Sequence, residues 1–499
     1  MVHSHLEIEQ KFDVTPAFVM PPLDAALRAP TSDETVVVEH EAIYFDTEDL
    51  RLAQRGITLR RRGGGDDQGW HLKLPVAADE RMEFGEPFTD ELSVPEPLSR
   101  LVAATTRGAP LTPVARLRNR RTAHRLSDDA GHVLLEVADD AVTGETFGEP
   151  ARNSSWRELE IELVEGEREQ LARLSKVLGK AGATPSASAS KLARTIGITG
   201  RSAEPDLTGR KVTAGAVLLA YLRQYQSALL ANDPAVRLDR PDAVHQMRVA
   251  SRRLRSALRT FAPLFTGESH RELEQGLARL ARVLGAERDA EVLLERMRSS
   301  LDALPAELVL GSVRHDVEAW LGDTYFTAKR EARDYLDSHE YLALLDQLEA
   351  FLVDPPLSGL AAKPARREIT TRVNKTVAKV RRQGRRALAT APGASRDAAL
   401  HRVRRLAKLS RYIADVHALH EPKPATRLSK QMARVQEVLG DRHDGAVMAG
   451  VLRDFAARTG ATGGNGFTYG LLLAHEEARG AGTERQFARQ LKRLRPMPR

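Results

Sequence analysis

Hydrophobic and polar residues alternate through most of the first two hundred positions of the chain. In HLEIEQKFDV, close to the N-terminus, Leu6, Ile8 and Phe12 stand on one face of an extended chain and charged residues stand on the other. This period of two is typical of a β-strand. Similar short runs recur up to about residue 163, and helices are expected only near residues 97–106 and 167–181. The pattern predicts an antiparallel sheet or barrel with few helices.

After about residue 211 the period changes to that of amphipathic helices and stays so almost to the end. Residues 199–211 lack periodicity and contain Gly and Pro, so we expect a linker between domains at 1–198 and 212–499. Helix breaks are predicted at Asp233–Pro234, Pro263, Pro305, 354–357, 392–393 and 421–424. The break at 354–357 divides the helical part into halves at about 212–353 and 366–493.

One basic helix in this part occurs twice. The residues His245, Arg248, Arg252 and Arg255 are matched, 156 positions later, by His401, Arg404, Lys408 and Arg411. Steps of three and four residues place each set on one helix face, and Arg259 extends the first set. Similar segments follow the two helices, VLGAERDAEVL with Asp289 and VLGDRHDGAVM with Asp444. The repeat predicts a bundle of two pseudo-symmetric halves.

A third basic stripe lies between these two helices. It contains Arg372, Lys375, Lys379, Arg382 and Arg386. A single charged stripe is usually a solvated helix face. Three stripes in one module would repel one another in a bundle, and a bound polyanion would relieve that repulsion.

The charge of the chain is divided unevenly. Residues 1–200 carry 24 Lys and Arg against 33 Asp and Glu, and the remaining residues carry 51 against 35. The two parts therefore have net charges of −9 and +16, within a total of +7. The second part is expected to bind a polyanion, and the mixture of acids and bases in the first suits a metal ion held together with an anion.

Several classes of function are excluded by the composition. The chain has no cysteine, so disulfides, thiolate nucleophiles and cysteine metal sites are absent. It has no GxxxxGK, HExxH or GxSxG motif. No apolar run reaches the ~18 residues of a membrane-spanning helix, and the N-terminus lacks the apolar core of a signal peptide. We expect a soluble cytoplasmic protein without membrane contact.

Charged residues share one face in at least five of the predicted strands. The sets are Glu7, Glu9 and Lys11; Arg60 and Arg62; Arg81 and Glu83; Glu136 and Asp140; and Glu158, Glu160 and Glu162. One such strand would be read as the solvent face of a half-buried sheet. Five of them favour a sheet closed around a charged interior, where acids bind divalent cations and bases bind phosphate oxygens.

These residues resemble the CYTH (triphosphate tunnel metalloenzyme) superfamily. Glu7, Glu9 and Lys11 match its ExExK signature, and YFDT at 44–47, LRRR at 59–62, HLKLP, ELEIEL and Lys191 in SKLAR continue the match over about residues 3–198. The resemblance implies an eight-stranded antiparallel tunnel that binds a triphosphate with Mg²⁺ or Mn²⁺ and hydrolyses its terminal phosphoanhydride. The implied fold class is α+β multidomain, a β tunnel or barrel followed by an all-α bundle of two repeats.

The resemblance also implies roles for single residues. Glu7, Glu9 and Lys11 would be catalytic. The triphosphate would be bound by Lys11, Arg60, Arg62, Lys73, Arg81, Arg121 and Lys191. The metal ligands would be Glu7, Glu9, Asp140, Glu158 and Glu160, with Glu136 and Glu162 near them, and the register within 158–162 stays open. Such a site acts by positioning and charge neutralisation, which is what phosphoryl transfer requires.

The helical part resembles the CHAD domain over about residues 212–493. The resemblance implies binding of inorganic polyphosphate and, since tandem CYTH and CHAD chains are a familiar bacterial arrangement, association with polyphosphate granules. The polyphosphate-binding residues would be His245, Arg248, Arg252, Arg255, Arg259, Lys375, Lys379, Arg382, His401, Arg404, Lys408 and Arg411. One departure is Arg288 in the first repeat where the second has His443.

Alternatives remain for ligand and activity. His245 and His401 are phosphate donors, metal ligands, or structural residues bonded to Asp289 and Asp444. Nucleic acid is a rival polyanion, although aromatic residues are few and do not interleave with the stripes. The leading hypothesis is a metal-dependent triphosphatase tethered to polyphosphate. A non-catalytic polyphosphate-binding protein and a nucleotide-binding or adenylate cyclase-like tunnel are the alternatives.

Overall fold

The structure is a computed structural model that describes residues 3–23, 32–65, 67–77, 79–148, 151–198, 206–209, 211–479 and 483–497. The chain forms two compact units, Met1–Ala203 and Glu204–Arg499, which we call the barrel unit and the helical unit. Most of the expected linker, residues 199–205 and 210, lies outside the described residues.

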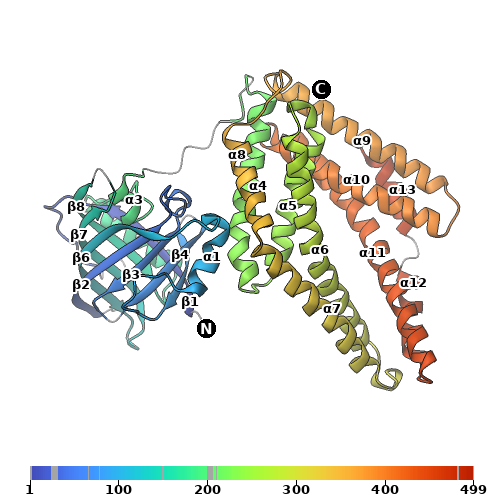
Figure 1. Cartoon of the computed structure of the whole chain (residues 1–499), viewed down its shortest axis with the longest axis horizontal. Coiled ribbons are helices and arrows are strands. Elements are labelled where there is room, and N and C mark those ends of the chain that lie inside the picture. The colour runs from blue at the N-terminus through green and yellow to red at the C-terminus, as the bar shows by residue number, and fades with distance from the viewer. Residues whose placement is uncertain are drawn as a thin grey trace. The chain divides into compact units, whose positions relative to one another are not determined.

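The barrel unit is built on antiparallel strands (Figure 1). They are β1 (His3–Asp13), β2 (Ser32–Asp46), β3 (Thr58–Gly63), β4 (Gly69–Ala77), β5 (Glu80–Glu86), β6 (Thr112–Ser127), β7 (Val133–Thr146), β8 (Asn153–Leu163) and the short β9 (Thr184–Pro185). Their order is β5-β4-β3-β2-β6-β7-β8-β1-β9, and β1 also pairs with β5. That pairing closes strands β1 to β8 into a barrel, which confirms the predicted fold class.

Strand register directs the charged faces into the barrel. Residues directly opposite in an antiparallel pair point to the same side of the sheet. Glu7 stands opposite Arg81, and Lys11 opposite Glu160. Arg121 stands opposite Asp140, and Glu136 opposite Glu162. Each charged face meets another across the ladder, so the alternation seen in the sequence becomes a charged interior.

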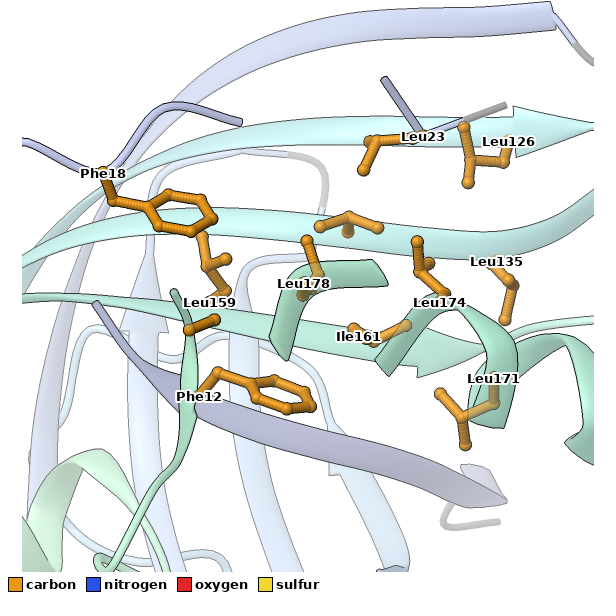
Figure 2. Packing of buried hydrophobic residues seen from close by; sticks show 12 residues of the cluster. Phe12, Phe18, Leu23, Leu126, Leu135, Leu159, Ile161, Leu171, Leu174 and Leu178 are labelled. Carbon is orange, nitrogen blue, oxygen red and sulfur yellow. The ribbon is translucent and has the colours of Figure 1, made fainter. Parts of the chain in front are cut away.

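Helices cover the outside of the barrel and one of its ends. They are α1 (Glu96–Thr106), α2 (Arg168–Lys180), α3 (Lys191–Ile196) and a 3₁₀ turn, η2 (Ala53–Arg55). The helix α2 begins with a capping box between Glu167 and Gln170. Its Leu171, Leu174 and Leu178 pack on the outward residues of β1, β7 and β8, as Figure 2 shows. This apolar layer lies outside the barrel because the interior is charged.

Apolar side chains fill one end of the barrel interior. Tyr44, Leu117 and Val142 come from the inward positions of β2, β6 and β7, and they form a buried cluster with Leu192 of α3. Ser190 caps α3 by accepting a hydrogen bond from the backbone of Ala193 at 3.0 Å. The cap and the cluster together fix α3 across this end of the barrel.

The helical unit contains ten α-helices in the part of the chain that the structure describes (Figure 1). They are α4 (Ala214–Arg237), α5 (Ala243–Thr260), α6 (Ser269–Asp302), α7 (Val313–Leu336), α8 (His339–Val353), α9 (Ala365–Ala389), α10 (Ala394–Ala418), α11 (Pro422–Ala461), α12 (Phe467–Arg479) and α13 (Thr483–Arg493). In each set of five, the first helix packs on the second, the second on the third, and the third on the fourth and fifth. The helices α4–α8 and α9–α13 are therefore two copies of one arrangement.

The predicted break at Asp233–Pro234 is wrong, because α4 continues to Arg237. Pro234 lies in the last turn of α4, so only three helical residues follow the backbone hydrogen bond that the proline removes. Asp233 is fully buried and accepts hydrogen bonds from Arg237 at 2.6 Å and from Tyr341 of α8 at 2.9 Å. Tertiary contacts therefore hold this turn in a helix that the local sequence would end.

The two repeats meet along α5 and α10 and again far from that contact. Arg253 of α5 donates a hydrogen bond to Asp415 of α10 at 2.7 Å. Its guanidinium lies 4.9 Å from the ring centre of Tyr225 and 4.8 Å from that of Tyr412. A second contact is an apolar cluster of α6, α7, α11 and α12 that includes Met297, Val317, Phe455 and Tyr469. These contacts hold the repeats together without using the basic stripes.

Leu174→Ala is expected to lower the free energy of unfolding of the barrel by about 2 to 5 kcal/mol, because the side chain is fully buried under α2. Urea unfolding followed by circular dichroism measures the effect. Val164→Ala is the control, since Val164 is 49% exposed and should change the free energy by less than about 0.5 kcal/mol. Equal effects of the two substitutions would contradict the assignment of this core.

Candidate functional site

A cavity of about 580 Å³ occupies the barrel interior and is lined mainly by charged side chains. Every strand from β1 to β8 contributes to it or holds residues that contact its lining. At the end away from the apolar cluster, the cavity reaches His5 and Asp67, whose side chains are 63% and 66% exposed. The cavity is therefore open to solvent at this end.

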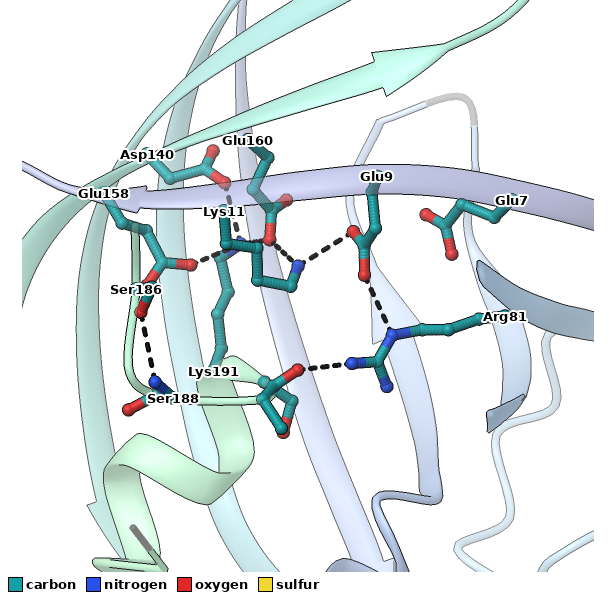
Figure 3. Close-up of polar contacts among 12 residues, drawn as sticks. Glu7, Glu9, Lys11, Arg81, Asp140, Glu158, Glu160, Ser186, Ser188 and Lys191 are labelled. Atoms are coloured by element: carbon teal, nitrogen blue, oxygen red, sulfur yellow. Dashed lines mark hydrogen bonds and ion pairs between the residues drawn. The ribbon is translucent and has the colours of Figure 1, made fainter. Parts of the chain in front are cut away.

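Three buried carboxylates converge on one side of the cavity (Figure 3). One oxygen from each of Asp140, Glu158 and Glu160 lies within 4.8 Å of the other two. The Lys191 ammonium stands among them, 2.9 Å from Asp140, 2.9 Å from Glu158 and 2.5 Å from Glu160. Lysine is unfavourable in the first turn of a helix, where the backbone dipole is positive. The acids supply the attraction that holds Lys191 at the start of α3.

Two further cations share these acids. Lys11 pairs with Glu9 at 2.8 Å and also with Glu160. Arg121 donates to both oxygens of Asp140 at 2.8 Å and to Glu160 at 2.6 Å. Glu160 thus contacts three cations at once, and its carboxylate links β1, β6 and α3.

A second charged group lies on β1, β4 and β5. Lys73 pairs with Glu7 at 2.5 Å and with Glu83 at 3.1 Å. Glu83 also pairs with the buried His71 at 2.7 Å. Arg81 pairs with Glu9 at 3.0 Å, and the charge of Lys73 also acts on Glu9. The two groups are therefore neighbours that interact electrostatically at Glu9.

Neighbouring charges shift the pKa values of these acids strongly. Burial alone would raise the pKa of Glu9, but Lys11 and Lys73 outweigh it and bring the pKa to about 2. Burial opposes Lys191 and Arg121 in the same way at Asp140, and its pKa also falls to about 2. Both carboxylates are charged at neutral pH and available as ligands for a cation.

Two groups in the cavity have shifts of the opposite kind. Burial, followed by the charge of Glu7, raises the pKa of Glu162 to about 7. Burial, followed by the charges of Arg60 and Arg121, lowers the pKa of Arg62 to about 9. A bound metal ion lowers the repulsion between neighbouring carboxylates, and a bound anion lowers the repulsion between neighbouring arginines. Both kinds of ligand therefore suit the cavity.

The structure brings the predicted tunnel residues together. Lys11, Arg60, Arg62, Lys73, Arg81, Arg121, Lys191, Glu7, Glu9, Glu136, Glu160 and Glu162 line the cavity, and Asp140 and Glu158 contact it through Lys191. The sequence reasoning missed His71, Asn119 and Arg125, which also line it. Each stands two or four positions from a predicted residue on the same strand, so the strand alternation could have found them. Their roles in binding and catalysis are taken up under the proposed function.

The acid cluster fits a divalent cation. Carboxylate oxygens are the ligands that Mg²⁺ and Mn²⁺ prefer. Asp140, Glu158 and Glu160 offer three of them around the point where Lys191 now places a positive charge. Glu9 reaches the same group through Lys11. The cluster could therefore hold a metal ion once Lys191 moves aside.

In the helical unit, the two matched basic stripes share one electrostatic cluster. Arg248 pairs with Asp289 of α6 at 2.9 Å, and Arg404 pairs with Asp444 of α11 at 3.9 Å. Arg255 pairs with Glu274 at 3.3 Å. Among the described residues, neither Arg252 nor Lys408 has an acidic partner in an ion pair. We call Arg248, Arg252, Arg404, Lys408 and Arg411 the central cationic cluster, because each of the other four acts on the charge of Lys408.

The pKa values in this cluster reflect repulsion between like charges. Burial, then Arg252 and Arg404, lower the pKa of Lys408 to about 7. Burial also lowers the pKa of Arg252, with Arg248 adding to the effect, and burial with Arg288 lowers that of His245. An anion bound here would reverse these shifts. The cluster is therefore a candidate polyanion site.

The other predicted residues of the helical unit lie differently. Asp289 and Asp444 pair with Arg248 and Arg404, so each aspartate serves an arginine of the matched stripe. Arg259 is exposed at the end of α5. Lys375, Lys379 and Arg382 are exposed on α9, and none of them acts on the charge of Lys408. These three cations therefore face solvent and are separate from the central cationic cluster.

Comparisons with known proteins agree with this division of the chain. Residues 5–196 match the model of the CYTH domain, and residues 220–453 match that of the CHAD domain. The uncharacterized protein MT2285 of Mycobacterium tuberculosis (strain CDC 1551 / Oshkosh) is 36% identical over 489 residues, which cover 95% of this chain and 93% of that protein. The chain belongs to the family that joins a CYTH domain to a CHAD domain.

Two solved structures resemble parts of this CYTH–CHAD protein. PptA from Streptomyces chartreusis is 20% identical, with a TM-score of 0.46, and covers 56% of this chain and 99% of its own. The CHAD domain from the plant Ricinus communis is 26% identical, with a TM-score of 0.46, and covers 59% of this chain and 97% of its own. Among the described residues, none of the helices combines the length and the apolar character needed to cross a membrane.

Lys408→Met is expected to raise the melting temperature of the ligand-free protein most at pH 7 and progressively less up to pH 10. The unfolded chain keeps the Lys408 proton up to about pH 10.5, whereas the folded protein loses it near pH 7. Between these values the unfolded state binds more protons, so the stability of the unsubstituted protein rises with pH and approaches that of the variant.

Differential scanning fluorimetry at several pH values measures this effect, which we expect to be about 2 °C or more at pH 7. Lys379→Met is the matched control, because Lys379 is exposed on α9. The difference in melting temperature between this control and the unsubstituted protein should not change between pH 7 and pH 10. A flat difference for Lys408→Met would show that the cluster does not repel this lysine.

Proposed function

We propose that the CYTH domain is a metal-dependent triphosphatase that hydrolyses inorganic triphosphate or a similar short phosphoanhydride, and that the CHAD domain binds inorganic polyphosphate. One observation carries the proposal: a cavity inside the closed barrel, where three converging carboxylates lie among buried lysines and arginines. Acids alone would suit a metal and bases alone an anion. A phosphate chain with its metal ion requires both.

The phosphate oxygens would be bound by cations from six elements. These are Lys11 of β1, Arg60 and Arg62 of β3, Lys73 of β4, Arg81 of β5, Arg121 of β6 and Lys191 of α3. Most of them now pair with acids of the interior. Arginine forks can bind two phosphate oxygens each, and the lysines act as point charges. These contacts would hold the chain in line for attack on its terminal phosphorus.

The metal ion would be held by Asp140, Glu158 and Glu160, with Glu7 and Glu9 on the neighbouring strand β1 and Glu136 and Glu162 close by. When bound, Mg²⁺ or Mn²⁺ neutralises charge on the phosphate oxygens and lowers the pKa of a coordinated water. Glu7, Glu9 and Lys11 are the residues to which we assign catalysis. Lys11 touches both Glu9 and Glu160, so it would carry the positive charge between the acids and the phosphate.

Acids and bases of the cavity now neutralise one another in ion pairs, and a metal ion with a phosphate chain could take over both halves of these pairs. Lys11, Arg121 and Lys191 now pair with carboxylates that would hold the metal ion. With these acids neutralised by the ion, the three side chains would be available to bind the phosphate oxygens. Because these pairs are buried, each exchange occurs away from bulk water, where electrostatic interactions are stronger. Substrate and metal ion are therefore expected to bind with positive cooperativity.

A nucleotide is the second candidate ligand of the tunnel. The cavity of about 580 Å³ falls within the range of pockets for organic ligands, and its outer part is lined by Val36 and Val38. A nucleoside triphosphate would place its phosphates on the same cations. Cyclase-like chemistry or simple binding without turnover would then replace triphosphate hydrolysis, and product analysis separates the three.

The first test replaces Glu7 and Glu9 together by glutamine and measures phosphate release from triphosphate with Mg²⁺ or Mn²⁺. We expect the rate to fall by about 100-fold or more, since both carboxylates would help to bind the metal ion and to neutralise its charge. A chelator should abolish the activity of the unsubstituted protein, and added metal should restore it.

The control replaces Glu39 and Glu145, two exposed acids of β2 and β7, by glutamine, which removes the same charge from the outside of the barrel. Its rate should stay within twofold of the unsubstituted protein. Hydrolysis that needs no metal, or that survives the change at Glu7 and Glu9, would refute the enzymatic proposal.

The second test replaces Arg252, Arg255, Lys408 and Arg411 by glutamine and measures binding of short polyphosphate at several salt concentrations. Each phosphate contact that is lost should flatten the salt dependence by about 0.7 in log–log slope, if polyphosphate behaves like a single-stranded polyanion. At physiological salt we expect at least about tenfold weaker binding.

The matched control removes four exposed and ion-paired arginines of the first repeat, Arg271, Arg279, Arg298 and Arg314. The net charge is then the same as in the test variant. Equal loss of binding in both variants would show that the affinity for polyphosphate depends only on the net charge of the protein. Unchanged binding in the test variant would show that polyphosphate binds elsewhere.

A further inference from the structure

The solvent-exposed sides of the helices α9 and α13 carry an unusual excess of positive charge. Nine of their side chains are exposed cations without an ion pair among the described residues: Lys375, Lys379, Arg382, Arg385, Arg386, Arg485, Arg489, Lys492 and Arg493. Within α9 and α13 the acids are Glu368 and Glu484. We call these nine residues the outer basic face.

The packing of α9 and α13 does not use these cations. The two helices meet through apolar side chains, where Phe487 and Leu491 of α13 lie against Gly384 of α9. A Cβ atom at Gly384 would come within 2.8 Å of Leu491, so the contact is close. Glu484 turns away to pair with Arg396 of α10, and Glu368 pairs with Arg372. The outer basic face is therefore left without internal compensation.

The first repeat provides an internal comparison, because α4 and α8 occupy the places of α9 and α13. The helix α9 has nine Lys and Arg and one Glu, and α13 has four and one. In contrast, α4 has two Arg and one Asp, and α8 has three acids and no Lys or Arg. The net charges of the two helix pairs are +11 and −2. The same packing is thus achieved with and without the cations.

This asymmetry separates the outer basic face from the central cationic cluster. Both repeats supply the cluster, through Arg248 and Arg252 in one and Arg404 and Lys408 in the other. Only the second repeat supplies the outer face. A charge pattern that folding does not require, and that one of two equivalent repeats lacks, indicates an external partner of opposite charge.

We propose that the outer basic face is a docking surface for long inorganic polyphosphate, separate from the central cationic cluster. This inference rests on the polyphosphate-binding function proposed above. The exposed residues between the cations include Thr371, Ala378, Ala389 and Gln486 and no aromatic side chain. A surface of this kind offers no aromatic platform on which nucleic-acid bases could stack. It suits a polymer that presents charge and no bases.

The two surfaces together make binding depend on chain length. A short chain can occupy one site at a time, so its affinity is set by the better site. A long chain can bind both, and the second contact is then intramolecular and strengthens binding without any new interaction. The affinity should therefore rise with polyphosphate length by a larger factor than the number of phosphate units alone would produce.

The experiment uses the full chain with Arg385, Arg386, Arg489 and Arg493 replaced by glutamine. These side chains are exposed, so the melting temperature should stay within about 2 °C, and it is measured first. Binding is compared for polyphosphate of about 10 units and of several hundred units, and for single-stranded and duplex DNA, at fixed ionic strength. The variant lacking Arg271, Arg279, Arg298 and Arg314 is again the charge-matched control.

The proposal requires a selective loss. Binding of long polyphosphate should weaken at least tenfold in the outer-face variant, binding of the short chain should change less than twofold, and the control should lose neither. Equal losses for short and long chains, losses equal to those of the control, or a loss confined to DNA would overturn it. If the unsubstituted protein binds neither the short nor the long polyphosphate, the function proposed for the CHAD domain fails as well. If it binds both and the outer-face variant shows no selective loss, only the present proposal fails.

Discussion

Three carboxylates that share one ammonium group set the terms for the barrel interior. Lys191 pairs with Asp140, Glu158 and Glu160 and offsets the repulsion among these buried acids, and the acids in turn offset the cost of placing Lys191 at a helix N-terminus. This mutual dependence ties α3 to β7 and β8. The apolar layer is displaced to the outside of the barrel, under α2, because the inside is reserved for charge.

The helical unit deals with charge in the opposite way. Arg252 and Lys408 have no acidic partner among the described residues, and burial, then the neighbouring arginines, lower the pKa of Lys408 to about 7. The repeats are held together elsewhere, by Arg253 between two tyrosine rings and by the apolar cluster of α6, α7, α11 and α12. Stability and ligand binding are thus assigned to different parts of the bundle, so the cationic surfaces are free to vary between repeats.

Much of this was accessible from the sequence, since alternation in a strand decides which residues share a face. That rule placed Glu7, Glu9 and Lys11 on one face, and the same pattern in five strands, with the family resemblance, pointed to the inner face. Partners across the barrel did not follow from the pattern, because the register that sets His71 beside Glu83 depends on how β4 and β5 pair. The prediction at Asp233–Pro234 failed for a related reason: one of the two buried hydrogen bonds of Asp233 comes from Tyr341, in a helix about a hundred residues away.

The apolar cluster of Tyr44, Leu117, Val142 and Leu192 fills the barrel interior at the end covered by α3, whereas His5 and Asp67 at the other end are exposed. The buried acids and Lys191 lie next to the filled end. Under the function proposed above, a phosphate chain that enters from the exposed end would bring its terminal phosphate to these residues first. The depth of the cavity would then favour attack at the end of a chain over attack at an internal bond.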